Sequence, residues 1–358
     1  VHRKFDYLKL GELLEKRELV KRISIAPAVR VAIGEAFSLG EENVEGKIVA
    51  GLKKIGFDYV FDVTFGADLT IMEEAMELVA RIQEKGRFPM FTSCCPAWVE
   101  YVETFYPEFI PNLSSCKSPI TMQSTMIKTY FAEREGIDVK RLLNVVVAPC
   151  TAKKAEIKRG EVNRSGEYFR VSGVDDTDYL LTTRELISLF RDNNIDFSSL
   201  KEEKFSSPLG KGSSAGLLFG KTGGVMEAAL RTTYYFLNHK DLDNDKLLFQ
   251  GVRGIKGVKS LEVDLGEVSL KVAVVNGLKN VSSLLDKLKR GEVYFDFIEV
   301  MSCDFGCVGG GGQPKLTLLE MKERKQKRLD SIEKEDEESK IRLCHRNPEI
   351  VKSEAKRS

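Results

Sequence analysis

Cysteines that lie far apart in the chain constrain its fold more than any other feature of the sequence. Thiolates are soft ligands that select zinc, copper(I) or iron–sulfur clusters. If several of them bind one group, the chain has to fold so that segments between positions 94 and 307 surround a common centre. Five of the seven cysteines lie in short, distinctive segments, which are Thr92-Ser93-Cys94-Cys95-Pro96, Ala148-Pro149-Cys150-Thr151-Ala152-Lys153-Lys154, Met301-Ser302-Cys303 and Phe305-Gly306-Cys307.

Length and composition fit a large globular protein. The 358 residues can form one big domain or two modest ones, and contents of 42% hydrophobic and 30% charged residues are ordinary for such a chain. The formal net charge of +1 produces no global field that would favour nucleic acid or a membrane. An odd number of cysteines at irregular spacing argues against a disulfide framework and favours metal binding or catalysis in a reducing compartment.

The sequence shows neither a secretion signal nor a membrane span. The segment Val1–Phe5 lacks the apolar core of a signal peptide, and no apolar stretch approaches the roughly 20 residues that cross a bilayer. We therefore expect a cytoplasmic protein with no nucleic-acid or membrane partner. The chain begins with Val1 rather than Met, which leaves open whether a segment precedes it.

Short apolar runs that alternate with amphipathic segments predict an α/β fold with mostly parallel strands. Ligands of such sheets gather beyond the carboxyl ends of the strands. Three of the cysteine segments directly follow expected strands, so we predict one shared site. A smaller hairpin region is expected around Gly251–Gly254 and Glu262–Gly266. Strands are expected at residues 59–63, 88–91, 144–147, 272–275 and 295–300, and helices at residues 7–23, 29–37 and 71–85.

The composition changes towards the C-terminus. Residues 322–340 are crowded with charge and almost free of large apolar side chains. Such a stretch is typical of a solvated helix or a mobile tail. We therefore divide the chain into a main domain at residues 1–320 and a charged C-terminal helical segment or tail at residues 321–358.

The spacing of the cysteines fits an iron–sulfur cluster better than zinc. A structural zinc site usually has two close Cys-x-x-Cys pairs, whereas here only Cys303 and Cys307 form a close spaced pair. A 4Fe-4S cluster needs four thiolates, which distant single cysteines can supply. The two cysteines outside the motifs, Cys116 and Cys344, are expected to be small buried hydrophobic residues.

Cys94 and Cys95 are unsuited to bind the same small cluster in the same way. Side chains of adjacent residues in an extended segment point in opposite directions. One of the two is therefore expected to be a ligand, and the other a free thiol that lines the same pocket. Elsewhere in the motifs, the glycines Gly309–Gly312 would let backbone approach a bulky inorganic group. Lys153 would place an ammonium over an anionic ligand, although a lone lysine is more often a surface charge.

Taken together, these segments resemble the three signatures of iron-only (FeFe) hydrogenases. The first signature corresponds to Thr92–Pro96, the second to Pro149–Glu156, and the third to Glu299–Pro314, which has one more glycine before Gln313. The similarity runs from about Ile25 to Pro314. Further segments that look like this family are Ala26–Glu35, Ala67–Glu74 and Phe219–Ala229.

The resemblance implies a fold and a cofactor. The fold would be a two-lobed α/β catalytic domain with mostly parallel sheets flanked by helices and the active site between the lobes. The cofactor would be the H-cluster, in which a 4Fe-4S cubane is linked through Cys307 to a two-iron unit that carries carbon monoxide, cyanide and an azadithiolate. The cubane would be held by Cys95, Cys150, Cys303 and Cys307.

The resemblance also implies roles for residues around the cofactor. One cyanide would accept a hydrogen bond from a lysine, and the other would be approached by backbone. Further side chains would line the pocket. The residues concerned are Lys153 for the first cyanide, Pro27 and Ala28 for the second, and Met301, Phe219 and Ser118 for the lining.

By the same resemblance, Cys94 is the free thiol and passes protons between the bridgehead amine of the cofactor and the protein. The further carriers would be Glu74, Ser114 and Glu77, with Arg81 near the mouth of the path. Glu74 and Glu77 are three residues apart on an expected helix, so they share a face, and Arg81 follows four residues later. Without the resemblance, an exposed charge pair and a salt bridge would explain this pattern.

The implied reaction is the reversible combination of two protons and two electrons to dihydrogen. No ferredoxin-like Cys-x-x-Cys-x-x-Cys segment precedes the matching region in the given sequence. Electrons are therefore expected to reach the cubane from an external one-electron carrier such as ferredoxin. Dedicated maturation proteins would assemble the cofactor.

Two other kinds of protein share this scaffold. Hydrogen sensors tend to lose the relay thiol and to gain a signalling domain. Non-catalytic iron–sulfur assembly factors usually lack the paired cysteine of the first signature and carry extra N-terminal cysteines. Because Cys94 is present, the sequence favours the enzyme over both alternatives.

Several positions depart from the family pattern. Ala148 stands where many members have Met, Ala97 where many have Gly, and Ile120 where a Gln often lies near the cofactor. These changes remove a thioether and a polar contact from the surroundings of the cluster. Because such contacts tune metal sites, we expect an altered reduction potential or catalytic bias.

Overall fold

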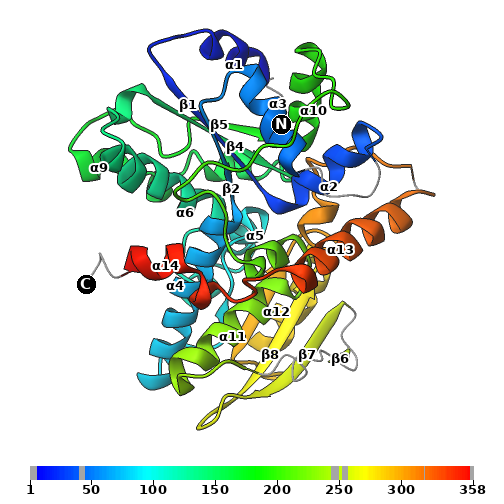
Figure 1. Cartoon of the computed structure of the whole chain (residues 1–358). Coiled ribbons are helices and arrows are strands. Elements are labelled where there is room, and N and C mark those ends of the chain that lie inside the picture. Colours follow the sequence, from blue (N-terminus) through cyan, green and yellow to red (C-terminus); the bar gives the residue numbers. More distant parts are fainter. Residues whose placement is uncertain (1–5, 40–44, 243–249, 252–256, 318, 355–358) are drawn as a thin grey trace.

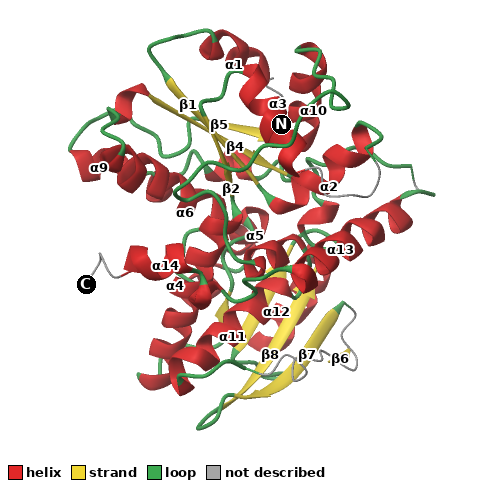
Figure 2. Ribbon diagram, in the orientation of Figure 1, coloured by secondary structure: helices red, strands yellow, loops and turns green. Residues whose placement is uncertain are grey.

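The computed structural model of the chain describes residues 6–39, 45–242, 250–251, 257–317 and 319–354. Its strands form two separate sheets, one in each of two lobes (Figure 1). Helices flank both sheets (Figure 2). This arrangement confirms the two-lobed α/β fold that the sequence predicts. Within the described residues, no helix combines the length and the apolar composition of a membrane span.

The first lobe is built on a sheet of four strands in the order β2-β1-β4-β5. Every pair of neighbours in this sheet is parallel. The central strand β4 is buried along its whole length, as expected for a parallel strand that is covered on both faces. The strands are β1 (Val20–Ile25), β2 (Tyr59–Asp62), β4 (Leu142–Ala148) and β5 (Tyr179–Thr182).

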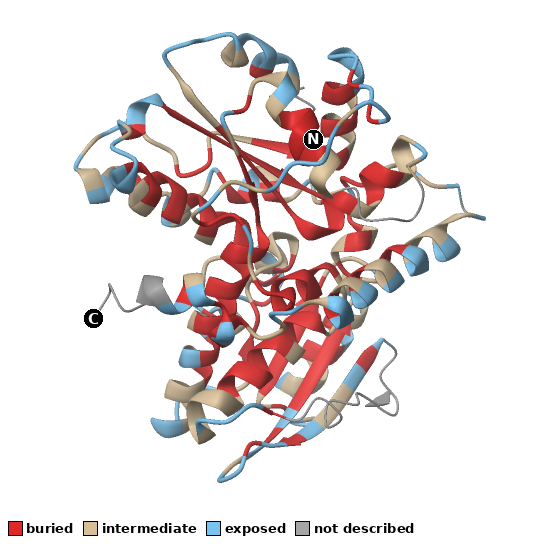
Figure 3. Ribbon diagram, in the orientation of Figure 1, coloured by how far each residue is buried: buried red, intermediate tan, exposed pale blue. Residues whose placement is uncertain are grey.

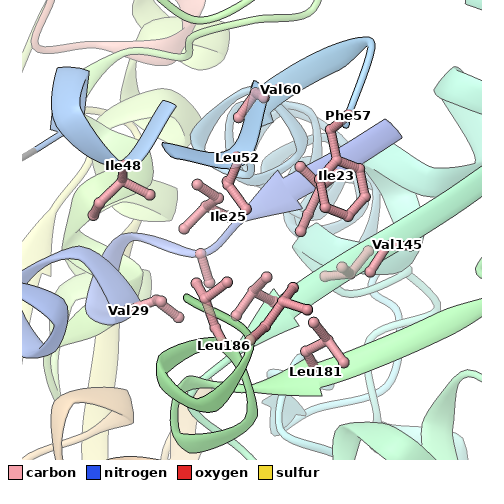
Figure 4. Packing of buried hydrophobic residues seen from close by; sticks show 14 of the residues in the cluster. Ile23, Ile25, Val29, Ile48, Leu52, Phe57, Val60, Val145, Leu181 and Leu186 are labelled. Carbon is pink, nitrogen blue, oxygen red and sulfur yellow. The ribbon is translucent and has the colours of Figure 1, made fainter. Parts of the chain in front are cut away.

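Helices pack on this sheet through a large apolar cluster. In Figure 4, Ile23, Ile25 and Val145 of the strands lie beside Leu52 and Leu186 of the helices. Burial of such side chains is the main force that holds the helices on the sheet, at about 1.5–3 kcal/mol for each fully buried residue. The helices that contribute are α1 (Asp6–Leu14), α2 (Pro27–Ala36), α3 (Glu45–Ile55) and α10 (Thr183–Asp192).

The second lobe contains a mixed sheet of five strands in the order β3-β9-β8-β7-β6. The pairs β3–β9 and β9–β8 are parallel, whereas β7 is antiparallel to both of its neighbours. One apolar cluster joins this sheet to α5 (Pro96–Phe105) and α12 (Leu278–Lys289), and a second joins it to α11 (Gly224–Asn238). The strands are β3 (Met90–Phe91), β6 (Gln250–Gly251), β7 (Val258–Asp264), β8 (Ser269–Asn276) and β9 (Phe297–Met301).

Helix α4 (Thr64–Gln83) connects the two lobes. Phe65 near its start packs in an apolar cluster with Phe61 of β2, and Leu78 near its end packs in a cluster with Phe297 of β9. Figure 3 shows buried ribbon along most of the first sheet, along much of β8 and through the region where the lobes meet, whereas β7 is largely half-buried or exposed. The remaining helices are α6 (Pro119–Met126), α7 (Ala132–Arg134), α8 (Lys153–Glu156), α9 (Ser165–Phe169), α13 (Met321–Glu338) and α14 (Pro348–Glu354).

The expected helix at residues 7–23 is wrong in its second half. The helix ends at Leu14, and Val20–Ile25 forms β1 in the interior of the first sheet. The charged Arg22 hides this strand in the sequence. In the structure its side chain is buried, with the guanidinium carbon 3.4 Å from the centre of the Phe131 ring. The aromatic ring of Phe131 thus stabilises the guanidinium of Arg22 inside the protein, whereas the sequence pattern predicts that Arg22 is exposed to solvent.

Two further segments follow the expectation but show more detail than the sequence predicts. The hairpin is formed by β7 and β8, so the strand expected at 272–275 is also one arm of an antiparallel pair. Residues 252–254 of the expected hairpin region lie outside the described residues. The charged stretch after residue 320 contains helix α13, whose side chains are mostly exposed, although Arg328, Ile332 and Asp336 are buried.

The buried ion pair between Arg30 and Asp62 generates a stability prediction. Arg30 is 3% exposed and Asp62 is 0% exposed, and their side chains are 3.0 Å apart. Replacing Arg30 with alanine leaves a buried carboxylate without its cation, which is expected to lower the free energy of unfolding by about 3–5 kcal/mol. Urea denaturation followed by circular dichroism measures this change.

The matched control for this prediction is Arg134→Ala. Arg134 is 51% exposed in its ion pair with Glu135, and pairs of this kind contribute about 1 kcal/mol or less. Equal losses of stability in the two variants would contradict the prediction, because burial would then have no influence on the strength of the ion pair.

Candidate metal-cluster site

One pocket is lined by residues from both lobes that lie far apart in the sequence. Cys94, Cys95, Cys150, Cys303 and Cys307 all line it, and we call it the cluster pocket. Cys94 and Cys95 lie between β3 and α5, Cys150 follows β4, and Cys303 follows β9. The carboxyl ends of strands in two different sheets thus bring all five motif cysteines together, as expected for ligand sites in such sheets.

The thiols suit a cluster rather than a single ion. Among the described residues, no group of three His, Cys, Asp or Glu side chains is arranged to hold one metal ion. The motif cysteines all line one pocket and enclose a common volume. Four soft thiolates around such a volume are the donor set of a 4Fe-4S cluster. The residues present therefore fit the cofactor that the sequence implies.

Burial and mutual repulsion act on the cysteine sulfurs. Burial raises the pKa of Cys303 to about 11, and the neighbouring sulfurs of Cys150 and Cys95 add to this effect. Burial also raises the pKa values of Cys150 and Cys307 above the usual range. Metal ligation requires thiolates, so cluster binding here would release protons and depend on pH.

Glycines in the third motif bring the ligand segments together. An added Cβ at Gly310 would lie 2.3 Å from the carbonyl oxygen of Pro149, and one at Gly312 would lie 2.8 Å from the carbonyl carbon of Pro149. Both approaches are closer than real Cβ contacts. These glycines make room for the protein backbone next to Cys150, and Gly310 also lines the cluster pocket, where the sequence predicts a close approach to an inorganic group.

Lys153 is buried at the edge of the cluster pocket. Its ammonium donates to the backbone oxygen of Cys94 at 2.9 Å and lies 2.8 Å from a carboxylate oxygen of Glu156. Burial, the largest single effect, lowers the pKa of Lys153, but the charge and hydrogen bond of Glu156 together with the sulfurs of Cys94 and Cys150 raise the pKa above its usual value. Lys153 is therefore a fixed cation beside the pocket and not the surface charge that a lone lysine usually is.

The other predicted pocket residues fall into two groups. Pro27, Ala28, Met301 and Phe219 line the cluster pocket, as do Ile120 and Ala148, where the sequence departs from the family pattern. Ser118 does not appear among the lining residues; its hydroxyl lies 3.2 Å from that of Thr121. Gln313 was missed as a positioning residue, and its amide donates to the backbone oxygen of Ala28 at 2.6 Å.

The acidic residues of α4 lie in contrasting surroundings. Glu74 is 1% exposed. Burial raises its pKa to about 8, against a hydrogen bond with Ser114 that lowers it. Glu77 is half-buried; one of its oxygens accepts from Ser114 at 3.0 Å, and the other lies 2.6 Å from the guanidinium of Arg81. Glu74 is thus not the exposed charge that the pattern alone suggests.

Cys94 lies at the inner end of this series. Burial raises the pKa of its thiol well above the usual range, and the nearby charge of Glu74 adds to the effect. Glu74 forms a hydrogen bond with Ser114, the hydroxyl of Ser114 also donates to Glu77, and Glu77 pairs with Arg81. Cys94 lines the cluster pocket, and a proton path from its thiol to Glu74 stays a prediction.

Two residues next to this series were not predicted to belong to it. The backbone and hydroxyl of Ser115 donate to Glu77 at 2.9 and 3.0 Å. The thiol of Cys116 lies 3.7 Å from the same carboxylate, so the expectation that Cys116 is simply a buried hydrophobic residue is wrong. Cys344 is buried as expected. Only the run Ser114-Ser115-Cys116 in the sequence signals these donors.

The raised pKa of Glu74 generates a prediction about stability and pH. Its pKa is 4.5 ordinarily and about 8 in the folded chain. Between these values the folded state keeps a proton that the unfolded state releases, so stability falls as pH rises through this window. Glu74→Gln removes the penalty. We expect it to gain on the order of 2–4 kcal/mol over the parent protein at about pH 8 and much less at about pH 5.

Thermal or urea unfolding at the two pH values measures this difference. The control is Glu77→Gln, which loses contacts with Arg81 and Ser114 and should bring no gain at the higher pH. A Glu74→Gln variant that is equally affected at both pH values would show that Glu74 has an ordinary proton affinity.

The ligand set generates a second prediction. Cys303→Ala removes one of the four sulfurs, and protein reconstituted anaerobically with iron and sulfide is expected to lose most of its cluster iron, from about four atoms per chain. Iron and sulfide analysis measures the loss. Cys344→Ala is the control, because Cys344 is buried outside the cluster pocket. Unchanged iron in Cys303→Ala would exclude Cys303 as a ligand.

Comparison with known proteins agrees with this geometry. Residues 21–311 match the family described as iron only hydrogenase large subunit, C-terminal domain. Iron hydrogenase 1 of Clostridium pasteurianum is 43% identical over 333 residues, which cover 92% of this chain and 56% of that protein. The periplasmic Fe hydrogenase large subunit of Nitratidesulfovibrio vulgaris is 44% identical over 308 residues, which cover 85% of this chain and 71% of that one.

Solved structures and more distant relatives extend the comparison. The FeFe-hydrogenase HydA1 of Chlamydomonas reinhardtii superimposes with a TM-score of 0.82 at 38% identity, and the alignment covers 97% of this chain and 93% of that one. The cytosolic Fe-S cluster assembly factor narfl of Danio rerio is 30% identical over 305 residues, which cover 82% of this chain and 72% of that one. The chain thus spans little more than half the length of the Clostridium relative. It belongs to the iron-only hydrogenase family.

Proposed function

We propose that the chain is a hydrogenase that interconverts dihydrogen with two protons and two electrons at an H-cluster. The observation that carries this proposal is that five motif cysteines line one pocket. In addition, Ser114 forms hydrogen bonds with both the buried Glu74 and the half-buried Glu77. A site that only stored an iron–sulfur cluster would need the ligands but no such series of proton carriers.

Within this proposal, four sulfurs hold the cofactor and further groups orient it. When bound, the H-cluster supplies iron that exchanges electrons with protons and dihydrogen. Its cubane would be held by Cys95, Cys150, Cys303 and Cys307, with Cys307 shared with the two-iron unit. The buried ammonium of Lys153 would donate to one cyanide, a charge-assisted bond. Backbone at Pro27 and Ala28 would approach the other.

The protein residues would then move protons and exclude water. Cys94 would exchange a proton with the pocket and with Glu74. Because the pKa of Glu74 is about 8, this carboxyl can both take up and release a proton near neutral pH. The hydroxyl of Ser114 contacts Glu77 and would pass the proton outward, while Arg81 holds Glu77 in place. Phe219 and Met301 contribute apolar surface that keeps the pocket dry.

Partners follow from this chemistry as part of the proposal. An external one-electron carrier such as ferredoxin would deliver electrons to the cubane. Dedicated maturation proteins would install the two-iron unit. The division of the chain into a catalytic domain at residues 1–320 and a charged segment at residues 321–358 belongs to the same proposal.

Two alternatives to an enzyme differ from it in the cofactor that they would bind or in their turnover. An assembly factor would bind the cubane without the two-iron unit, and a hydrogen sensor would bind both but turn over slowly. The presence of Cys94 in the cluster pocket supports the enzyme, because neither alternative requires a relay thiol. The higher identity to hydrogenases, 43% against 30% for the assembly factor, supports it as well.

The relay thiol generates the test of this proposal. After maturation, infrared bands of iron-bound carbon monoxide and cyanide are expected in both the parent protein and Cys94→Ala, since Cys94 is not a ligand. Hydrogen production by Cys94→Ala is expected to fall about 10²–10⁴-fold, the usual contribution of a positioned proton carrier. Infrared spectroscopy and a hydrogen evolution assay on the same samples measure both effects.

Cys344→Ala serves as the control and should keep both the bands and the activity. A parent protein with a cubane but without these bands would be an assembly factor. Bands without turnover would indicate a sensor. Full activity in Cys94→Ala would remove Cys94 from the proton path.

A further inference from the structure

Helix α13 follows the residues that match the family model, and it packs against elements that line the cluster pocket. The match ends at residue 311, and α13 is Met321–Glu338. The helix contacts α2, the 3-10 turn η5 (Ser214–Gly220) and the 3-10 turn η7 (Cys307–Gly309), each of which contributes lining residues. Figure 1 shows α13 crossing the molecule between the two lobes.

The guanidinium of Arg328 is the polar centre of this contact. Arg328 is only 2% exposed. It donates to both carboxylate oxygens of Glu35 on α2, at 2.8 and 2.6 Å. A third bond, at 3.1 Å, goes to the backbone oxygen of Val308, the residue directly after Cys307. A single side chain therefore ties the ligand-bearing turn to the helix whose first residues also line the pocket.

An apolar contact lies one turn further along α13. Ile332 is 2% exposed and packs in a small cluster with Ala28, Leu217 and Val308. The approach is so close that an added Cβ at Gly220 would lie 2.5 Å from the terminal methyl of Ile332. The wall of the pocket and α13 are therefore in direct contact, without space between them.

Two acidic residues anchor the end of the helix. Asp336 accepts a hydrogen bond from Ser214 of η5 at 2.5 Å. Glu335 lies 3.1 Å from the buried Arg30 of α2. Together with Arg328 these contacts fix α13 to all three elements, which distinguishes it from a solvated helix that touches the protein by chance.

We propose that α13 is a positioning element of the cluster site and that Arg328 is its central positioning residue, which holds the Cys307 turn against α2. The inference rests on the proposed function, in which Cys307 binds the cluster. Groups that orient a ligand from outside tune the metal, and their loss typically costs about 10–100-fold in metal affinity. The planar fork of arginine can bond a carboxylate and a carbonyl together, which the single ammonium of lysine cannot reproduce.

The test compares full-length Arg328→Ala and Arg328→Lys with the parent chain after reconstitution with iron and sulfide alone. We expect both variants to bind the cubane but to release iron to a chelator about ten-fold faster, in line with the effect of lost outer contacts. We also expect the electron paramagnetic resonance spectrum of the reduced cluster to change in both variants. The spectrum reports the geometry of the ligands and is insensitive to a general loss of stability.

Arg324→Ala is the matched control, because Arg324 lies one turn earlier on the same helix and is 43% exposed. It should keep the parent spectrum and rate of iron release. If Arg328→Ala does not fold, Glu35→Gln replaces it in the test. This variant weakens the same contact between Arg328 and α2 and should change the spectrum in the same way.

The outcomes separate this inference from the proposed function. Variants at Arg328 and Glu35 that melt at lower temperature but keep the parent spectrum and iron release would overturn the positioning role and leave the hydrogenase proposal intact. A parent chain that takes up no cluster would overturn the proposed function, and the inference with it.

Discussion

Backbone lies directly against backbone where the second and third cysteine motifs meet. The amide of Gly312 donates to the backbone oxygen of Pro149 at 2.7 Å, and neither Gly310 nor Gly312 has space for a Cβ. Pro149 continues β4 of the first sheet, while the glycines follow the Cys303–Cys307 turn of the second sheet. A side chain at either glycine would push these segments apart and with them the sulfurs. The cluster pocket depends on this contact, because it joins ligands that two different sheets supply.

Helix α4 places two neighbouring carboxyl groups at different depths in the protein. Glu74 is enclosed, and burial raises its pKa to about 8. Glu77, one turn later, accepts hydrogen bonds from Ser114, Ser115 and Arg81. Hydrogen bonds to a carboxylate stabilise its charged form, whereas desolvation destabilises it. A helix that only connected the lobes would need neither arrangement, so this contrast supports a role in proton transfer.

Helix α13 shows how a highly charged stretch can belong to a site. Most side chains of α13 face solvent, as their composition predicts. Arg328, Ile332 and Asp336 lie on its buried face, where each finds a partner on an element of the cluster pocket. Charged residues are seldom fully buried unless they are paired, and Arg328 and Asp336 both have ion-pair partners. The helix thus contributes to the site through a few residues that composition alone hides.

Much of the site could be predicted because its chemistry is local in the sequence. Cysteine motifs that follow strands predict a shared site from the geometry of strand ends, and all five motif cysteines line one pocket. That one of the pair Cys94-Cys95 is a ligand and the other a free thiol stays a prediction. Glu74, Glu77 and Arg81 share a helical face because residues three or four apart lie on the same side of a helix. The helix expected over residues 7–23 failed because Arg22 looks solvated, and only the ring of Phe131 makes its burial acceptable.

The amino-acid sequence by itself determined which groups are available: soft thiols at strand ends, acidic residues at helical spacing, and glycines beside the last ligand pair. Only the tertiary structure decided what those groups meet. In the folded chain, the glycines contact the backbone of the other lobe, and the hydroxyl of Ser118 lies next to that of Thr121. The thiol of Cys116 contacts Glu77, and Arg328 donates to the turn that contains Cys307. These outcomes depend on contacts between segments far apart in the chain, whose distances no local pattern encodes.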